Sequence, residues 1–222
     1  MDGNGRWAES KKHSRFFGHV RGAKKAQWLI EVCAQLKLPY LSLFALSTEN
    51  LSRPQVEVKA LQKLLEKLFL KHSDFLIKNQ IKLDFLGDLS VFSPFLKKLC
   101  ENLCNKTKNN PGLNLIIALN YGGRQEILQA FQKLLKKEKE KNIELESLSE
   151  ESIKPFFSSS RFPEPDLIIR TGGNFRLSNF YLWSASYSEL YFTKTLWPDF
   201  DQEDLSLALK HFKKARRKYG KI

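Results

Sequence analysis

The sequence Tyr40-Leu41-Ser42-Leu43-Phe44-Ala45-Leu46 runs directly into Ser47-Thr48-Glu49-Asn50-Leu51-Ser52-Arg53-Pro54. The first seven residues are mostly apolar and follow Pro39, which is typical of a buried strand. The polar residues come next, at the carboxyl end of that strand, where open α/β sheets bind their ligands. This stretch therefore predicts a strand and one side of a binding site. In the alternative interpretation, Ser52 only caps the next helix.

The rest of the chain alternates in the same way. Apolar runs predict further strands at residues 81–86, 113–120 and 166–169. Apolar residues at helical spacing predict helices over residues 15–38, 55–78, 91–108 and 125–141. Strands that alternate with helices favour an α/β fold with a mostly parallel central sheet flanked by helices. The leucine stripe of the 55–78 helix suits either a core or the wall of an apolar tunnel, and the pattern does not separate the two.

Composition limits the class of protein. The chain has 222 residues, of which 42% are hydrophobic, and this is compatible with one domain and a sizeable core. We find no apolar run near the roughly 20 residues that cross a bilayer and no secretory leader, so we expect a cytoplasmic protein. The three cysteines form no C-x-x-C pair, which indicates reduced structural thiols. A net charge of +13 calls for an anionic partner: nucleic acid, an acidic membrane or a polyphosphate.

The chain begins Met1-Asp2-Gly3-Asn4-Gly5-Arg6-Trp7-Ala8, with one carboxylate among glycines. Glycines allow a positive φ and a close approach to the backbone, so we expect a loop that wraps a small anion. A lone Asp suits magnesium, which takes few protein carboxylates and fills its shell with water and phosphate. Arg6 can hold a phosphate with two parallel hydrogen bonds. An ordinary turn is the alternative interpretation.

Two later segments add groups that bind phosphate. Residues 18–25 lie at the start of a predicted helix, where His19 could donate to a phosphate or shuttle a proton, although a solvated histidine is the alternative. The sequence Arg170-Thr171-Gly172-Gly173-Asn174-Phe175-Arg176-Leu177-Ser178-Asn179 follows a predicted strand and combines two guanidinium groups with hydroxyls. Glu189 follows in an aromatic stretch, where a carboxylate is expected to be paired or bound to metal. Together these segments indicate a substrate with a polyphosphate head and a hydrocarbon tail.

The chain resembles the cis-prenyltransferase family in four sequence motifs and in their order along the chain. These motifs are residues 1–8, 18–25, 46–54 and 170–200. The resemblance covers nearly the whole chain, and the combination of motifs is highly specific. It implies one catalytic domain over residues 1–222, with an elongated hydrophobic tunnel and Mg²⁺ as cofactor. In that family, farnesyl diphosphate is extended by isopentenyl diphosphate units, each of which adds a cis double bond. The implied product is a long polyprenyl diphosphate, here undecaprenyl diphosphate, the lipid carrier precursor for cell-wall synthesis.

The same resemblance implies partners and residue roles. The enzyme would be a homodimer. Independently of the resemblance, the basic end at residues 213–221 leads us to expect peripheral contact with the anionic inner face of the membrane, and we expect no nucleic acid as a partner. Asp2 and Asn50 would be catalytic, and Asp2 and Glu189 would hold the metal. The expected substrate-binding residues are Gly3, Asn4, Gly5, Arg6, Trp7, Arg15, His19, Ser47, Thr48, Glu49, Arg53, Arg170, Arg176 and Ser178.

Four features depart from the family pattern. The family has a short apolar strand ahead of the Asp motif, whereas the sequence given starts at Met1. Leu51 stands where tryptophan is usual, and Phe175 where a histidine is often found. The Arg-x-Gly end, which in the family reaches the site of a neighbouring subunit, appears as Lys218-Tyr219-Gly220.

Two other classes of function compete with this hypothesis. A non-catalytic relative would keep the fold and serve as a binding subunit, but the complete set of Asp2, Asn50, Arg170, Arg176 and Ser178 argues against it. A nucleic-acid-binding protein would explain the net charge and the basic end at residues 213–221. No recognised motif for reading DNA or RNA supports that interpretation, and the basic end would equally suit anionic lipid.

Overall fold

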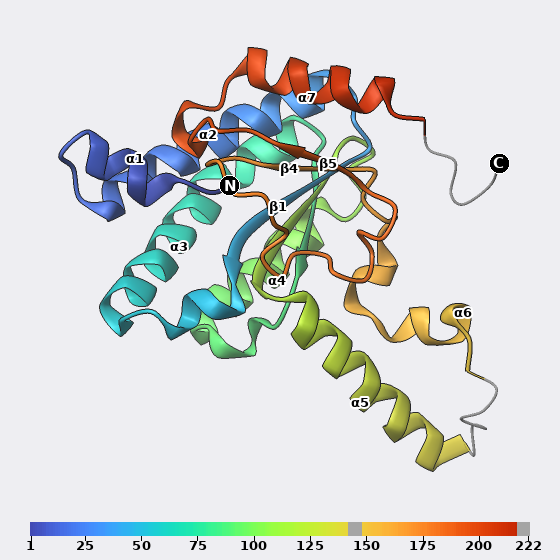
Figure 1. Ribbon diagram of the computed structural model, residues 1–222. Helices are drawn as coiled ribbons and strands as arrows, with labels where there is room; N and C mark the ends of the chain where they lie inside the picture. The colour runs from blue at the N-terminus through green and yellow to red at the C-terminus, as the bar shows by residue number, and fades with distance from the viewer. Residues whose placement is uncertain (142–147, 217–222) are drawn as a thin grey trace.

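In the computed structural model of the chain, the described residues are 1–141 and 148–216. All strand pairs are parallel. One sheet has the order β1-β3-β2, and β4 and β5 form a second, two-stranded sheet beside it (Figure 1). The strands are β1 (Tyr40–Ser47), β2 (Lys82–Leu86), β3 (Asn114–Tyr121), β4 (Leu167–Arg170) and β5 (Glu189–Phe192). The predicted parallel α/β fold is therefore confirmed.

Seven α-helices in the described part of the chain surround these strands. They are α1 (Asn4–Ser10), α2 (Arg15–Gln35), α3 (Gln55–Lys78), α4 (Pro94–Thr107), α5 (Gly123–Lys141), α6 (Glu150–Ile153) and α7 (Gln202–Lys214). Short 3-10 turns complete the chain, among them η1 (Thr48–Ser52) and η6 (Trp197–Asp199). Figure 1 shows α5 projecting away from the body of the molecule. The predicted helices agree with α2 to α5, and the bounds of α3 are those expected.

The core has two parts, one on each side of the larger sheet. The larger part packs α2, α3, α4 and α7 against the strands through buried residues such as Leu29, Phe69, Leu96, Leu115 and Leu205. The smaller part contains Tyr121, Ile168 and Tyr181, with Phe44 and Phe180 packed against it. The rings of Phe44 and Phe180 stack with their centroids 4.4 Å apart. Sequential side chains of β1 therefore contribute to both cores, as the alternation along a strand requires.

Strand β1 is less buried than a central strand. Only Leu43 and Leu46 of its eight residues are buried, whereas six of the eight residues of β3 are. The reason is that β1 lies at the edge of its sheet and borders the main cavity of the molecule. The predicted strand is confirmed, and its partial exposure reflects that cavity.

The prediction of an anion-binding loop at the start of the chain is wrong for most of residues 1–8, because most of them are helical. Gly3 takes a left-handed conformation with φ 107°, and helix α1 begins at Asn4. Gly5 then sits inside the helix, and Gly18 and Gly22 of α2 let the two helices approach closely. A Cβ on Gly18 would lie 2.0 Å from the carbonyl oxygen of Asn4, and one on Gly22 would lie 2.0 Å from Asn4 Oδ1. Helix α1 is therefore stabilised by packing, which local propensity does not reveal.

Some predictions concern other parts of the chain. The three cysteines are free, as expected, and burial raises the pKa of Cys33 to about 11. None of the helices in the described residues is long and apolar enough to cross a membrane. Residues 217–221 of the basic end, and with them Lys218-Tyr219-Gly220, lie outside the described residues.

We expect Gly18→Ala to lower the free energy of unfolding by about 1–3 kcal/mol, since an added methyl group would overpack the contact between α1 and α2. The sign is informative because Gly→Ala inside a helix usually stabilises by about 1 kcal/mol. Denaturant unfolding followed by circular dichroism measures the change, with Lys24→Ala on the exposed side of α2 as the control. A more stable Gly18→Ala protein would contradict the packing described here.

Candidate active site

Asp2 is held by its main chain. Its amide nitrogen donates to Thr171 Oγ1 at 3.0 Å, and the Thr171 hydroxyl donates to the Asp2 carbonyl oxygen at 2.8 Å. The amide nitrogen of Trp197 donates to the same carbonyl oxygen at 3.0 Å. Thr171 is fully buried. Three segments far apart in sequence therefore fix the position of one carboxylate.

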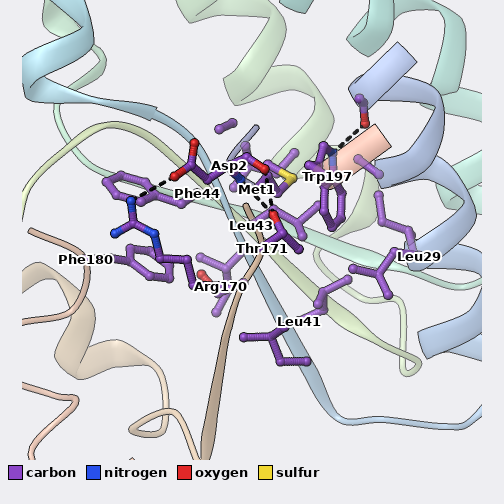
Figure 2. Close-up of a pocket in the computed structure, with 18 of the residues that line it drawn as sticks. Met1, Asp2, Leu29, Leu41, Leu43, Phe44, Arg170, Thr171, Phe180 and Trp197 are labelled. Carbon is purple, nitrogen blue, oxygen red and sulfur yellow. Dashed lines mark hydrogen bonds and ion pairs between the residues drawn. The ribbon is translucent and has the colours of Figure 1, made fainter. Parts of the chain in front are cut away.

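The Asp2 side chain accepts two hydrogen bonds on one oxygen. Arg170 Nη2 donates to Asp2 Oδ2 at 2.9 Å (Figure 2). Asn174 Nδ2 donates to the same oxygen at 2.9 Å, and Arg6 Nη2 lies 3.5 Å from Oδ1. Burial alone would raise the pKa of Asp2, but the hydrogen bonds from Arg170 and Asn174 and the charges of Arg170 and Arg6 outweigh it. The pKa of Asp2 is consequently lowered, and the group is a carboxylate at neutral pH.

A cavity of about 740 Å³ opens beside Asp2. It lies between β1 and β4 and is walled on its other sides by α2 and α3, among other elements. The structure brings most of the predicted site residues to its wall, namely Asp2, Gly3, Asn4, Gly5, Arg6, Arg15, His19, Ser47, Asn50, Arg53, Arg170, Arg176 and Ser178. Apolar residues line the remainder, and in Figure 2 Leu29 and Leu41 lie away from the Asp2–Arg170 pair. The cavity thus combines a polar part with an apolar part, while its continuation into a tunnel stays a prediction.

The five arginines on this wall form the arginine group, Arg6, Arg15, Arg53, Arg170 and Arg176. Arg15 pairs with Glu9 at 2.7 Å and Arg53 with Glu57 at 2.9 Å, so both are oriented by a neighbouring carboxylate. Arg170 donates to the carbonyl oxygen of Arg176 and to Ser178 Oγ as well as to Asp2. This concentration of guanidinium groups suits a diphosphate, whose oxygens accept several charge-assisted hydrogen bonds.

Three buried polar atoms of the cavity wall have no hydrogen-bond partner within the described chain. They are Asn4 Oδ1, His19 Nε2 and Arg170 Nε. Buried polar atoms are nearly always satisfied, so three exceptions around one cavity point to a polar ligand. Burial, with the charges of Arg53 and Arg15, lowers the pKa of His19 against the opposing effect of Glu57. His19 is therefore neutral at pH 7 when the cavity holds no anion.

Asn50 is fixed at the end of β1 by a capping box. Its Oδ1 accepts from the amide nitrogen of Ser47 at 3.1 Å, and the Ser47 side chain accepts from the backbone of Asn50 in return. Because the side-chain oxygen of Asn50 is engaged in this way, its side-chain nitrogen Nδ2 is the group that Asn50 can offer to a ligand. The turn η1 that carries Asn50 thereby starts at a defined place beside the cavity.

Asn179 connects this turn to the arginine group, a role that the sequence pattern did not reveal. Its Nδ2 donates to Glu49 Oε1 at 2.6 Å, and its Oδ1 accepts from the amide nitrogen of Arg124 at 2.8 Å. Ser178 and Asn179 both have left-handed backbones, with φ 48° and 68°. Gly122 is needed beside them, since a Cβ there would lie 2.5 Å from Asn179 Nδ2. Asn179 therefore joins η1, the start of α5 and the segment that follows β4.

Four predicted site residues are not part of the cavity wall. Trp7 is buried and donates from Nε1 to Asp199 Oδ1 at 2.7 Å, so it packs in the structure behind the site. Thr48 faces Gly122 and Glu49 binds Asn179, so both hold η1 in place. Glu189 pairs with Leu167, three positions before Arg170 on β4 and about 10 Å away along the strand. Asp2 and Glu189 of one chain are thus not brought together.

Sequence patterns did not identify two residues that bind Asp2 besides the arginines, Asn174 at its side chain and Thr171 at its main chain. Asn174 and Thr171 belong to the quoted segment after β4, yet nothing in their spacing shows that they bind Asp2. Their contacts span 169 and 172 positions of the sequence, which no local pattern reports.

The donor set fits a magnesium ion that shares its shell with a substrate. Within the described part of the chain, Asp2 Oδ1 pairs only with Arg6, at 3.5 Å, which is too long for a good hydrogen bond and leaves that oxygen available. The described residues contain no group of three or more His, Cys, Asp or Glu side chains able to hold a metal alone. Magnesium is commonly held by one or two carboxylates, with substrate phosphates and water completing its octahedron.

The fold and this site define an α/β protein that binds an anionic head group beside an apolar cavity, and comparison with known proteins agrees. A family model described as "Putative undecaprenyl diphosphate synthase" matches residues 1–220. The isoprenyl transferase of Wolinella succinogenes is 40% identical over 222 residues, covering 100% of this chain and 94% of its own. The ditrans,polycis-undecaprenyl-diphosphate synthase ((2E,6E)-farnesyl-diphosphate specific) of Coxiella burnetii is 43% identical over 220 residues, covering 99% and 93%.

A solved structure of a diphosphate synthase has the same fold as this chain. Lavandulyl diphosphate synthase from Lavandula x intermedia, in complex with dimethylallyl diphosphate, superposes with a TM-score of 0.95 at 31% identity. The match covers 100% of this chain and 95% of that one. The chain belongs to the undecaprenyl diphosphate synthase family of prenyltransferases.

We expect Asn179→Asp to weaken the binding of inorganic diphosphate by about tenfold or more, because a lost hydrogen bond to a charged group costs about 1.5–3 kcal/mol. The aspartate would repel Glu49 and release η1 from the segment after β4. Titration calorimetry measures the affinity.

The double variant Asn179→Asp with Glu49→Gln is the matched control, since a glutamine amide can donate to the new carboxylate. We expect it to restore most of the affinity, which makes the pair a double-mutant cycle. Wild-type affinity in Asn179→Asp alone, or no recovery in the double variant, would show that this connection does not shape the site.

Proposed function

We propose that the chain extends farnesyl diphosphate with isopentenyl diphosphate units, each adding a cis double bond, to give undecaprenyl diphosphate. The lipid carrier for cell-wall synthesis would derive from this product. The observation that carries the proposal is the Asp2 carboxylate, held by Arg170 and Asn174 where an arginine-lined wall meets an apolar cavity. The names of the relatives support the same reaction.

The arginine group would bind the diphosphates. Asn4, Arg6, Arg15 and His19 would surround the allylic diphosphate, and Arg176 and Ser178, with Arg170, the isopentenyl diphosphate. The lavandulyl diphosphate synthase structure holds dimethylallyl diphosphate, which is also an allylic diphosphate. As the allylic C–O bond breaks, the electron pair leaves with the diphosphate, and fixed guanidinium charges stabilise that group more in the transition state than before it.

The apolar part of the cavity would protect the reacting carbons. The double bond of isopentenyl diphosphate would attack the developing allylic cation and form the new C–C bond, and a proton would then pass to the departed diphosphate, which restores a double bond. Water would capture the cation, so the cavity must exclude it. The stacked rings of Phe44 and Phe180 lie on this wall and present π electrons that favour a nearby positive charge. Asn50 would orient the reacting groups with its amide nitrogen.

Mg²⁺ is part of the proposal, with Asp2 as its ligand from this chain. When bound, the ion would neutralise charge on the leaving diphosphate and so ease the breaking of the C–O bond. Asp2 can hold the ion because its lowered pKa keeps the carboxyl group ionised. Its fixed main chain would hold the carboxylate at the diphosphate, and Arg170 and Asn174 would orient it.

The proposal includes a cytoplasmic homodimer. Helix α5, which projects from the body in Figure 1, exposes Leu128, Phe131 and Leu135 on one side. Their spacing of three and four residues places them in one stripe, and Phe131 is 52% exposed. A second copy of the chain would cover this stripe, since long exposed apolar stripes mark protein interfaces.

The reaction is tested by incubating the purified protein with farnesyl diphosphate and labelled isopentenyl diphosphate and sizing the lipid product. We expect a long polyprenyl product with magnesium and none with EDTA. Asp2→Asn should lower the rate by about 10²–10³-fold, the usual effect of removing a group that stabilises developing charge. Glu101→Gln, on the exposed side of α4, is the control and should retain the rate.

A near-normal rate of Asp2→Asn at saturating magnesium would contradict the metal role. No incorporation by the wild-type protein, even after addition of the apolar strand that the family has ahead of the Asp motif, would favour a non-catalytic relative.

The dimer is tested by Phe131→Asp, which should convert the protein to a monomer in sedimentation velocity because a buried unpaired charge is costly at an interface. Lys136→Asp, at an exposed position of α5 that is neither three nor four residues from any member of the stripe, should remain a dimer. Dimers of equal stability for both variants would place the interface elsewhere.

A further inference from the structure

Helix α3 separates the main cavity from the surroundings. Its inner side lines the cavity through Leu61, Leu64, Leu65, Leu68, His72 and Phe75. In Figure 1 this helix lies at the outside of the molecule, and it packs against α2 and α4. A hydrocarbon chain in the cavity would therefore be one helix away from whatever lies against α3.

The outer side of α3 carries a row of positive charge. Lys59, Lys63, Lys67 and Lys71, here called the lysine row, follow one another at intervals of four residues, and all are exposed. Side chains at this interval lie on one side of a helix, and four of them extend over about 18 Å. Exposed apolar residues share the same side, namely Val56, Leu70 and Ile77, and Val56 is 82% exposed.

Two of the three acidic residues of α3 are engaged away from the lysine row, since Glu57 pairs with Arg53 and Glu66 accepts from Ser93. The third, the exposed Asp74, follows the last lysine of the row by three residues, so one carboxylate faces four lysines on this side. None of the ion pairs found among the described residues involves the lysine row. Like charges four residues apart weaken an isolated helix, so an anionic surface against this side of α3 would relieve their repulsion.

Apolar groups beside the lysine row distinguish between two anionic partners, nucleic acid and an anionic bilayer. A smaller cavity of about 320 Å³ lies between the first turns of α2 and α3, where Phe16, Pro54 and Val56 line it. Phe16 is itself exposed. Nucleic acid would match the lysines and leave these apolar groups without partners, whereas an anionic bilayer offers phosphates to the lysines and a hydrocarbon boundary to the apolar side chains.

We propose that the outer side of α3 is the surface by which this protein docks on a bilayer containing anionic lipid. This inference rests on the proposed function, because a polyprenyl product made beside α3 has to enter a membrane. The lysines extend to the lipid phosphates while their stems, with Val56, Leu70 and Phe16, lie at the boundary of the acyl chains. The tail of the product then passes beside α3 into the bilayer and avoids water.

The experiment measures binding to sedimented vesicles of phosphatidylcholine, alone or mixed with phosphatidylglycerol. The test variant changes the lysine row to glutamine (Lys59→Gln, Lys63→Gln, Lys67→Gln and Lys71→Gln). A control of equal charge changes exposed lysines of α4, its C-terminal end and α5 (Lys98→Gln, Lys106→Gln, Lys108→Gln and Lys136→Gln). Exposed substitutions of this kind leave folding nearly unchanged, which thermal unfolding verifies.

We expect the wild-type protein and the control to bind the mixed vesicles and not the neutral ones. The test variant should bind roughly 10²–10³-fold more weakly, since each lysine near an anionic surface strengthens binding about fivefold. Val56→Ser with Leu70→Ser should weaken vesicle binding several-fold and leave any binding to duplex DNA unchanged. Equal loss in the test variant and the control, or duplex DNA bound as tightly as the mixed vesicles, would overturn the proposal.

Prenyl transfer in detergent solution separates this inference from the proposed function. We expect the test variant to retain the wild-type rate there, because the lysine row points away from the cavity. If the wild-type protein transfers no prenyl units, the proposed function fails whatever the vesicles show. If transfer is normal and vesicle binding does not depend on the lysine row, the docking surface alone is wrong.

Discussion

The hydrogen bonds between Thr171 and the main chain of Asp2 are the interaction on which the site depends. The Thr171 hydroxyl accepts a hydrogen bond from the amide nitrogen of Asp2 and donates one to its carbonyl oxygen, and the amide nitrogen of Trp197 donates a third hydrogen bond to that carbonyl oxygen. Thr171 thereby joins Asp2 to the end of β4, so that the carboxylate of Asp2 and the guanidinium of Arg170 meet at a fixed distance. The polar part of the cavity is assembled around that junction.

The positive charge of the protein is divided between two residue types with different tasks. Arginines line the cavity, where planar groups with several donors can hold diphosphates in one orientation. Lysines cover the outside of α3, where flexible point charges suit a surface without fixed geometry. The net charge of +13 therefore does not describe one basic patch. It includes an inner set of arginines on the cavity wall and an outer set of lysines on α3.

Sequence patterns predicted the elements whose stability is local. The leucine spacing of α3 and the apolar runs of β1 and β3 fixed their type and, for α3, both ends. Helix α1 was not predicted, since Gly5 lowers its propensity and its stability comes from contact with Gly18 and Gly22. The short strand β5 was also missed because its hydrogen bonds come from β4. For the site, residue types indicated phosphate chemistry, but the partners of Asp2 and Glu49 arise from contacts over more than a hundred positions.

The run of left-handed residues after Arg176 has a consequence for turnover. Ser178, Asn179 and Tyr181 all have positive φ, a conformation that side chains other than glycine adopt only at a cost. That cost is met once, when the chain folds and the buried Tyr181 ring locks against its neighbours. The hydroxyl of Ser178 and the amide of Asn179 are consequently in position before any substrate arrives. Each round of a repeated reaction then begins from the same geometry, without an entropic penalty for reordering this segment.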